Sequence, residues 1–205
     1  MSRFTQPRLK VMRALGVDLP GLSRKTIETR PNPPGQHGAK ATRKRLSDFG
    51  VKLKEKQKLR FNYGLTETQM CNLMVEARKG NNPTGDNLLQ LLERRLDNVV
   101  FRAGFAPTGI SARQLVSHGH VLLNGRHANI PSIRVKIGDE ITLKVTSFKV
   151  FMVVESLAKP VLGRPDWLQW NETDKVIKVA HLPDADQVPF PVDVQQVVEY
   201  YANRV

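Results

Sequence analysis

Apolar residues recur at helical spacing through the middle of the chain. The pattern is clearest over 66–79, where an apolar residue returns every three or four positions, as on one face of an α-helix. Thr66 and Gln69 have the spacing of a capping box, and Gly80 follows the last apolar position, which is typical of helix ends. Further helices are predicted over 51–62, where charged residues have helical spacing and Gly64 follows, and over 86–96 and 193–203. Residues 97–103 either continue the helix at 86–96 or start a new one.

Residues 111–125 predict a short helix that leads directly into a β-hairpin. Ser111 and Gln114 have capping-box spacing, and Gly119 stands where such a helix would end. Alternating apolar residues then lead to Asn124-Gly125, the strongest short-range signal for a two-residue hairpin turn. The polar side of this helix offers hydrogen-bond donors and a cation but no carboxylate, so it is suited to a negatively charged partner.

The rest of the chain gives weaker patterns. Alternation or short apolar runs predict strands over 141–145, 150–154 and 176–179, with 160–174 as a loop that carries Trp167 and Trp170. Residues 1–46 are punctuated by Gly and Pro and are expected to be irregular and to become ordered against a partner. The fold class predicted is α+β, a mostly helical body with an inserted small α+β module and a basic N-terminal arm.

Charge identifies the kind of partner. The chain has 32 Lys and Arg against 19 Asp and Glu, a net charge of +13. Residues 1–60 hold 16 basic and 4 acidic side chains, whereas 151–205 hold 5 and 8. A basic third on a near-neutral body indicates a polyanion. Only Phe4 and Phe49 are aromatic in the first 60 residues, which favours nucleic acid over a membrane surface; a merely solvated charge excess is the plainer alternative.

The sequence gives little support for a reactive thiol, a metal site or a membrane segment. The single cysteine, Cys71, lies in an apolar helical run and is interpreted as a small core residue rather than a reactive thiol. The five histidines lack ligand-like neighbours, so neither a metal nor a cofactor is expected. The first residues lack the apolar run of a secretory signal, and no run approaches the ~18 residues of a membrane span. We therefore expect a soluble protein, with no membrane partner and no small-molecule substrate.

Candidate contacts with nucleic acid fall into three groups. Lys52, Lys56 and Arg60 repeat at i, i+4, and such unpaired like charges predict a cationic ridge that neutralises phosphates, since Glu55 and Gln57 give it little relief. The basic arm and its turn contribute Arg3, Arg8, Lys10, Gln36, His37, Lys40, Arg43, Lys44 and Arg45. The helix and hairpin contribute Arg113, Gln114, Ser117, His118, Asn124 and Arg126. For Arg94 and Arg95, pairing with Glu93 or Asp97 competes with contact to RNA.

Several segments, in order, resemble one known family. They are 33–38, 46–50, 55–60 with Tyr63-Gly64, 84–89, 92–102, 113–125 and 198–201. The chain resembles the bacterial and plastid type of the small-subunit ribosomal protein four (S4) family, and its run from Arg94 to Val150 resembles the small RNA-binding domain named after that family. The amino-acid sequence of residues 59–64 is most similar to that of cyanobacterial and plastid members. Residues 150–191 match weakly, and the cysteine zinc site of some relatives is absent.

This resemblance implies a structural role in the small ribosomal subunit. Family members bind small-subunit ribosomal RNA early in assembly, at a multi-helix junction of its 5′ domain, and influence decoding accuracy. They lie beside the proteins S5 and S12 and near the path of the messenger RNA. The expected location is the ribosome of the cytoplasm or of the plastid stroma. The implied domains are a basic extension at 1–46, a helical domain at 47–93 with helix 193–204 packed back on it, the S4-type domain at 94–150, and a sheet extension with loops at 151–192.

Two other classes of protein compete with this interpretation. The S4-type domain also occurs in RNA-modifying enzymes such as pseudouridine synthases, and Arg95-Leu96-Asp97 echoes a catalytic motif of theirs. The flanks of 93 residues before Arg94 and 55 after Val150 are too short for an ordinary catalytic domain, and no nucleophile–base set stands out, so no enzymatic activity is expected. A free RNA-binding factor differs only in not travelling with ribosomes.

Overall fold

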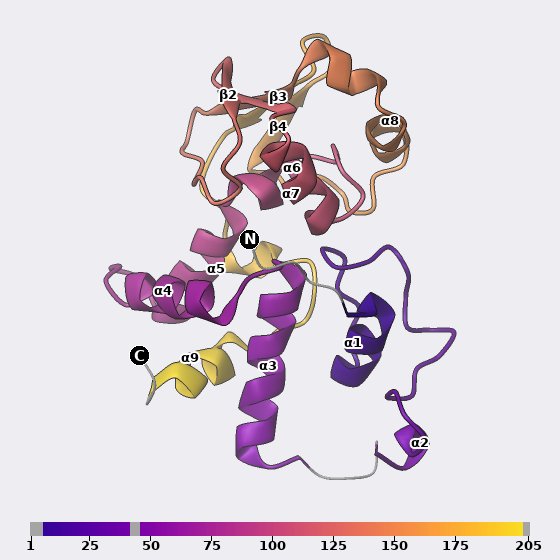
Figure 1. Cartoon of the computed structure of the whole chain (residues 1–205). Helices are drawn as coiled ribbons and strands as arrows, with labels where there is room; N and C mark the ends of the chain where they lie inside the picture. Colours follow the sequence, from indigo (N-terminus) through magenta and orange to yellow (C-terminus); the bar gives the residue numbers. More distant parts are fainter. Residues whose placement is uncertain (1–5, 42–45, 203–205) are drawn as a thin grey trace. The chain divides into compact units, whose positions relative to one another are not determined.

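The computed structural model describes residues 6–41 and 46–202 and divides into two compact units. The first unit comprises 1–88 and 190–205, and the second comprises 89–189. Figure 1 shows the first as helical and the second as helices around one sheet. The chain thus leaves its first unit, completes the second, and returns for its last helix. The predicted α+β class is confirmed.

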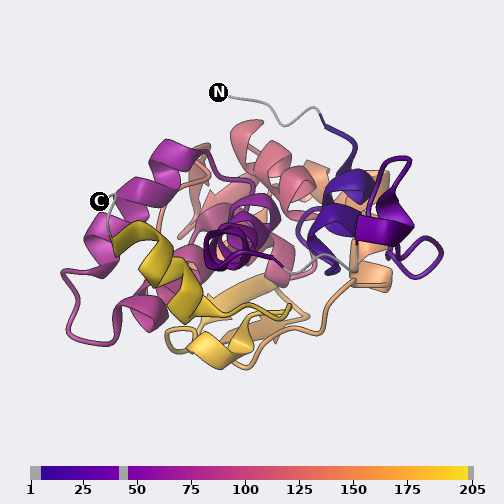
Figure 2. The same ribbon diagram turned by 90° about the horizontal axis from the view of Figure 1, so that it is seen from below.

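The first unit consists of helices. They are α1 (Arg8–Leu15), α2 (Gly38–Ala41), α3 (Asp48–Asn62), α4 (Glu67–Ala77), the first half of α5 (Thr84–Glu93), and α9 (Val194–Ala202). The terminal helix α9 lies across the side of α3, which Figure 2 shows nearly end-on. Burial of Tyr201, Leu59 and Val197 between these elements supplies the apolar contact that holds α9 in the unit.

Side-chain caps set where the helices of this unit begin. Thr66 and Gln69 form the predicted capping box of α4. Helix α3 begins three residues earlier than predicted, because Ser47 accepts a hydrogen bond from the Gly50 amide and Asp48 occupies the first turn, where a negative charge favours the helix dipole. Cys71 is half-buried rather than enclosed in the core.

The N-terminal arm is more ordered than its sequence predicts. It contains α1 and α2, so the expectation of an irregular segment is wrong for 8–15 and 38–41. Met12, Leu19 and Leu22 are at most 1% exposed, and Arg13 donates a 2.9 Å hydrogen bond to the Asn32 carbonyl. The apolar positions are too sparse to give a period, yet they suffice to bury one side of a two-turn helix.

The second unit is built on one antiparallel sheet. Its strands are β1 (Val121–Leu123), β2 (Arg126–Ala128), β3 (Glu140–Leu143), β4 (Leu168–Asn171) and β5 (Val176–Val179), in the order β2-β1-β3-β5-β4. Its helices are the end of α5, α6 (Leu96–Arg102), α7 (Gly109–Ser117), α8 (Phe151–Ala158) and the 3₁₀ turns η1 (Val145–Lys149) and η2 (Ala185–Gln187). Helices α6 and α7 pack on each other, and one apolar core fills the unit.

The hairpin between β1 and β2 has the predicted turn. Asn124 and Gly125 have φ angles of 49° and 75°, as a type I′ turn requires. The Asn124 amide oxygen accepts from the Glu140 amide, and its nitrogen donates to Asp139, both at 2.8 Å. The side chain therefore ties the turn to the start of β3.

Two predictions downstream of the hairpin are wrong. Residues 151–154 belong to helix α8, with Val150 as its N-cap, and not to a strand, because Val153 and Ser156 are buried on one helical side. A short run of β-branched residues cannot by itself distinguish the two. Residues 160–174 are not wholly a loop, because β4 runs through them. Trp167 is fully buried in the core, and the partly buried Trp170 packs against that core, edge-on to Phe105 with ring centroids 5.8 Å apart.

Candidate nucleic-acid interface

Helix α7 carries some of the contacts that the sequence predicts for the helix and hairpin. It starts two residues before Ser111, because Thr108 is the cap and accepts a hydrogen bond from the Ser111 amide. The predicted capping box at Ser111 and Gln114 is therefore wrong, while Gly119 ends the helix with a φ of 69°. Gln114 and His118 are exposed. Ser117 is partly covered, and its hydroxyl is buried without a partner within the described residues.

Arg113 is held inside the unit by a carboxylate. Its Nη2 and Nε atoms lie 2.6 and 2.9 Å from Oδ2 of Asp97, and that carboxylate also binds Arg95 through two atoms at 2.9 and 3.1 Å. Asp97 is 3% exposed and Arg95 is 5% exposed. The predicted pairing of Arg95 with Asp97 is confirmed, whereas Arg94 donates to the Val135 carbonyl. Two guanidinium groups on one buried carboxylate fix α7 relative to α6.

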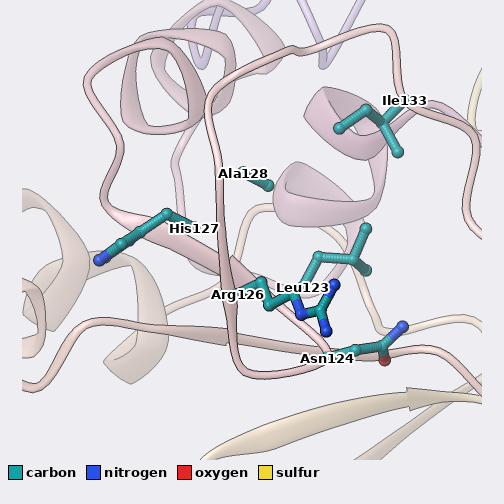
Figure 3. A pocket seen from close by; sticks show the side chains of 6 residues that line it. All are labelled: Leu123, Asn124, Arg126, His127, Ala128 and Ile133. Carbon is teal, nitrogen blue, oxygen red and sulfur yellow. The ribbon is translucent and has the colours of Figure 1, made fainter.

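The β1–β2 hairpin presents polar groups beside a shallow hollow. The hollow has a volume of about 470 Å³ and is lined by Leu123, Asn124, Arg126, His127, Ala128 and Ile133. Arg126 and His127 are exposed and make no ion pair with any described residue. Figure 3 shows Arg126 and Asn124 at the turn end of the hollow, while His127 points to the side. Sequence reasoning missed His127, although its place directly after the hairpin turn put it on an exposed edge strand.

The ridge predicted on α3 is not a row of unpaired charges. Lys56 is only 3% exposed and lies 2.8 Å from the Glu67 carboxylate. That carboxylate also accepts from the Tyr201 hydroxyl at 2.8 Å and lies 4.0 Å from Arg60. Burial raises the pKa of Glu67, but the hydrogen bonds from Lys56 and Tyr201 and the nearby cations outweigh it, so its pKa lies below its usual range. Burial and the same carboxylate raise the pKa of Tyr201.

Two further α3 cations, Lys52 and Lys58, are also paired with carboxylates. Lys52 lies 2.9 Å from Glu199 on α9, and this hydrogen bond lowers the pKa of the Glu199 carboxyl. Lys58 pairs with Glu55 at 2.6 Å, so Glu55 does relieve the charge. The prediction of an unpaired ridge is wrong because the carboxylates that meet Lys52, Lys56 and Arg60 come from α4 and α9, which are distant in sequence. These contacts join α3 to the helices around it.

Unpaired cations lie instead on the N-terminal arm. Arg8, Lys10 and Lys40 are exposed, and none of them makes an ion pair within 6–41 or 46–202. Gln36 and His37 are exposed in the turn before α2. Lys25 and Arg30, which the sequence interpretation left out, have the same properties. Four predicted contacts lie outside the described residues: Arg3, Arg43, Lys44 and Arg45.

Two other kinds of feature are absent from the described part of the chain. No group of three or more His, Cys, Asp or Glu side chains there is arranged to hold a metal ion. No helix within 6–41 and 46–202 is both long enough and apolar enough to cross a bilayer.

The second unit has a capped helix followed by a type I′ hairpin, and the first unit carries exposed, unpaired cations. This combination favours the class of RNA-binding proteins. Comparison with known proteins gives the family. Residues 3–93 match the family described as ribosomal protein S4/S9 N-terminal domain, and residues 94–141 match the S4 domain. The chain is 74% identical to small ribosomal subunit protein uS4 of Methylobacillus flagellatus and 70% identical to uS4B of Nitrosomonas europaea, each over 100% of both chains.

The chain therefore belongs to the small ribosomal subunit protein uS4 family. As a member of it, the chain is a structural component of the small ribosomal subunit and not an enzyme. Over the whole chain, identity to uS4 of a Synechococcus strain is 47%, below the 74% found for Methylobacillus. The resemblance of residues 59–64 to cyanobacterial and plastid members stays a prediction.

Proposed function

We propose that this chain binds folded small-subunit ribosomal RNA at a helix junction of the 5′ domain and nucleates assembly of that part of the subunit. In the assembled ribosome it lies near proteins S5 and S12 and the path of the messenger RNA, and contributes to decoding accuracy. The proposed contacts are sequence-independent ones to the sugar–phosphate exterior, because the deep major groove of A-form RNA is closed to side chains.

The distribution of unpaired charge carries this proposal. Arg8, Lys10 and Lys40 are solvated cations that bring no carboxylate with them, so binding to phosphates would release counterions without breaking an ion pair. On α3, by contrast, Lys52 must leave Glu199 and Arg60 must leave the neighbourhood of Glu67 before either meets a phosphate. Lys56 is enclosed in its pair, and we do not include it among the phosphate contacts.

The second unit supplies the smaller part of the interface. Arg126 and His127 flank the hairpin hollow, and Gln114 on α7 and His118 at its C-cap are exposed. The hydroxyl of Ser117 is buried, so we do not include it among the contacts. Arg113 and Asn124 act indirectly: the first positions α7 through Asp97, and the second holds the hairpin turn to β3. We propose that these two residues keep the RNA-facing groups in place and that they touch the RNA less than their neighbours do.

Chemical footprinting tests the proposed site on the RNA. Purified small-subunit ribosomal RNA is probed at its riboses and bases with and without the chain, at a concentration that saturates binding. We expect protections clustered at one junction of helices in the 5′ domain, together with co-sedimentation of the chain with small subunits in cell extract. Protections scattered over all domains, or confined to another domain, would contradict the proposal.

A matched pair of variants separates specific from general charge effects in the same footprint. Replacing Arg8, Lys10 and Lys40 by Gln removes three charges from the arm, whereas replacing Lys159, Lys175 and Lys178 by Gln removes three exposed charges from the second unit. The arm variant is expected to lose part of the protected set at a given concentration. The control variant is expected to protect the same nucleotides as the unmodified chain.

A further inference from the structure

The outer side of α8 is mainly apolar, although it faces solvent. Phe151 is 81% exposed and Val154 is 51% exposed, and Val145 in the preceding 3₁₀ turn is 82% exposed. Ala158, one turn beyond Val154, is also exposed. A helix on the surface of a protein ordinarily presents polar residues on this side. We call these four residues the α8 face.

The fold itself makes no use of this face. The opposite side of α8 anchors the helix, with Val153 and Ser156 buried and Met152 and Leu157 packed against the core of the second unit. Helix α8 lies beside η1 at the edge of that unit (Figure 1). The outward residues add exposed apolar area without adding to the core, and contiguous area of this kind marks interaction surfaces.

Cations border the α8 face at both ends of the helix. Lys149 lies just before α8 and Lys159 directly follows it. Both are exposed, and neither has an ion-pair partner in the described part of the chain. Glu155 is the single acidic residue within 144–161; it is exposed one turn after Phe151 and therefore lies on the same outer side. The surface thus has a mainly apolar centre that contains one carboxylate, and a positive rim.

We infer that the α8 face is a docking site for an amphipathic helix of another protein, whose apolar stripe covers Phe151 and Val154 and whose carboxylates meet Lys149 and Lys159. Apolar side chains at i, i+3 and i+7 match the spacing by which two helices pack. Opposite charges at the rim would select the partner and its direction.

A protein fits this surface better than RNA does. Bases stack on aromatic rings and guanidinium planes, yet three of the four residues of the α8 face are aliphatic. The unit that holds it is also nearly neutral, with 13 basic and 10 acidic residues over 89–189, whereas the first unit has 19 and 9. Charge therefore draws RNA mainly to the other unit, and apolar area draws protein to α8.

Site-specific photo-crosslinking in cells tests the inference directly. A photoreactive phenylalanine analogue replaces Phe151 or Val154 in the full chain, and a control chain carries it at Ile137, which is 59% exposed in the same unit. After irradiation the chain is purified, and its adducts are sorted into protein and RNA and sequenced. We expect one polypeptide, crosslinked from both positions through an apolar residue of a helix with Asp or Glu near its ends, and absent from the Ile137 control.

Charge reversal supplies the second arm of the test. Lys149→Glu combined with Lys159→Glu is expected to lower the yield of that protein adduct about tenfold, because like charges then meet at the rim. Adducts to RNA alone, no adduct at either position, or a protein adduct unaffected by the charge reversal would each overturn the inference. The inference stands apart from the proposed function, since sedimentation of the same cells reports whether the chain joins small subunits.

Discussion

The Nη2 atom of Arg113 lies 2.6 Å from Oδ2 of Asp97, and this contact joins α7 to α6. A side chain that the sequence presented as a free cation for RNA is therefore committed to the fold of its own unit. Because the same carboxylate binds Arg95, the position of α7 depends on one buried acid. If α7 contacts RNA as proposed, a change at Asp97 alters both stability and RNA binding.

Asp97→Asn should destabilise the protein strongly. Removing the charge leaves Arg95 buried without its counter-ion, which costs about 3 kcal/mol or more in the free energy of unfolding. Arg113→Gln should cost less, about 1 kcal/mol, because water reaches the position of its side chain. Chemical denaturation of the two single variants and the double variant gives the coupling between the residues. Full additivity would mean that the pair does not act as a unit.

The contacts of Glu67 with Lys56, Tyr201 and Arg60 should make the free energy of unfolding depend on pH in the acid range. The pKa of Glu67 is lowered in the folded chain, so its contribution to stability is complete above its ordinary pKa of about 4.5 and is lost as the pH falls through the lower folded value. Glu67→Gln should cost about 1–2 kcal/mol at neutral pH, since Lys56 then lies buried without a carboxylate. Below pH ~4.5 the difference between the two proteins should shrink.

A matched control shows whether that acid dependence belongs to the contacts of Glu67. Glu172 is exposed and makes no ion pair among the described residues, so Glu172→Gln should leave stability unchanged across the same pH range. Denaturant unfolding followed by circular dichroism from about pH 3 to pH 7 gives both comparisons. If Glu67→Gln and Glu172→Gln behaved alike, Glu67 would not be the carboxylate that holds α3, α4 and α9 together.

The cap of α7 can be assigned by two substitutions. Thr108→Ala should cost about 1 kcal/mol of stability, because it removes the oxygen that accepts from the Ser111 amide. Ser111→Ala removes only the 3.0 Å hydrogen bond between the Ser111 and Thr108 hydroxyls and keeps the capping bond, so it should cost less, about 0.5 kcal/mol. Thermal unfolding of the two variants measures the difference. The reverse order would restore Ser111 as the capping residue.

The hairpin turn offers a test of what Asn124 does. Asn124→Gly loses both side-chain hydrogen bonds but keeps the positive φ without strain, whereas Asn124→Ala loses the bonds and also strains the backbone. Alanine should therefore be less stable than glycine by about 1 kcal/mol. Both should weaken RNA binding only as far as they loosen the turn. Loss of RNA affinity in Asn124→Gly with unchanged stability would instead make Asn124 a direct contact.

Local signals in the sequence predicted much of the fold. The capping box at Thr66 and Gln69, the Asn124-Gly125 turn, and the helical spacing of α3 to α6 all act within a few residues, so they can be recognised without the tertiary structure. The start of α7 was missed because Ser111 and Thr108 offer equivalent capping oxygens three residues apart. Helix α8 was mistaken for a strand because the burial of Val153 and Ser156 decides between the two, and burial depends on the sheet.

The candidate interface was harder to predict than the fold. The spacing of Lys52, Lys56 and Arg60 is visible in the sequence, but their partners Glu199 and Glu67 come from other helices. Pairing across such distances is a tertiary property that no local pattern contains. The arm contacts were predicted from charge alone, and they stay predictions. Arg8, Lys10 and Lys40 support them, because these side chains are exposed and no described carboxylate pairs with them.

The salt dependence of RNA affinity tests most directly whether solvated cations of the arm, rather than the paired cations of α3, hold the RNA. Affinity for small-subunit ribosomal RNA is measured between low and high salt for the unmodified chain, for the variant with Gln at 8, 10 and 40, and for the variant with Gln at 52 and 60. Removal of one cation that binds a phosphate lowers the slope of log K against log salt by about 1. We expect a drop of about 3 for the arm variant and a clearly smaller drop, well below about 2, for the α3 variant. An unchanged slope in the arm variant, together with a drop of about 2 in the α3 variant, would contradict the account.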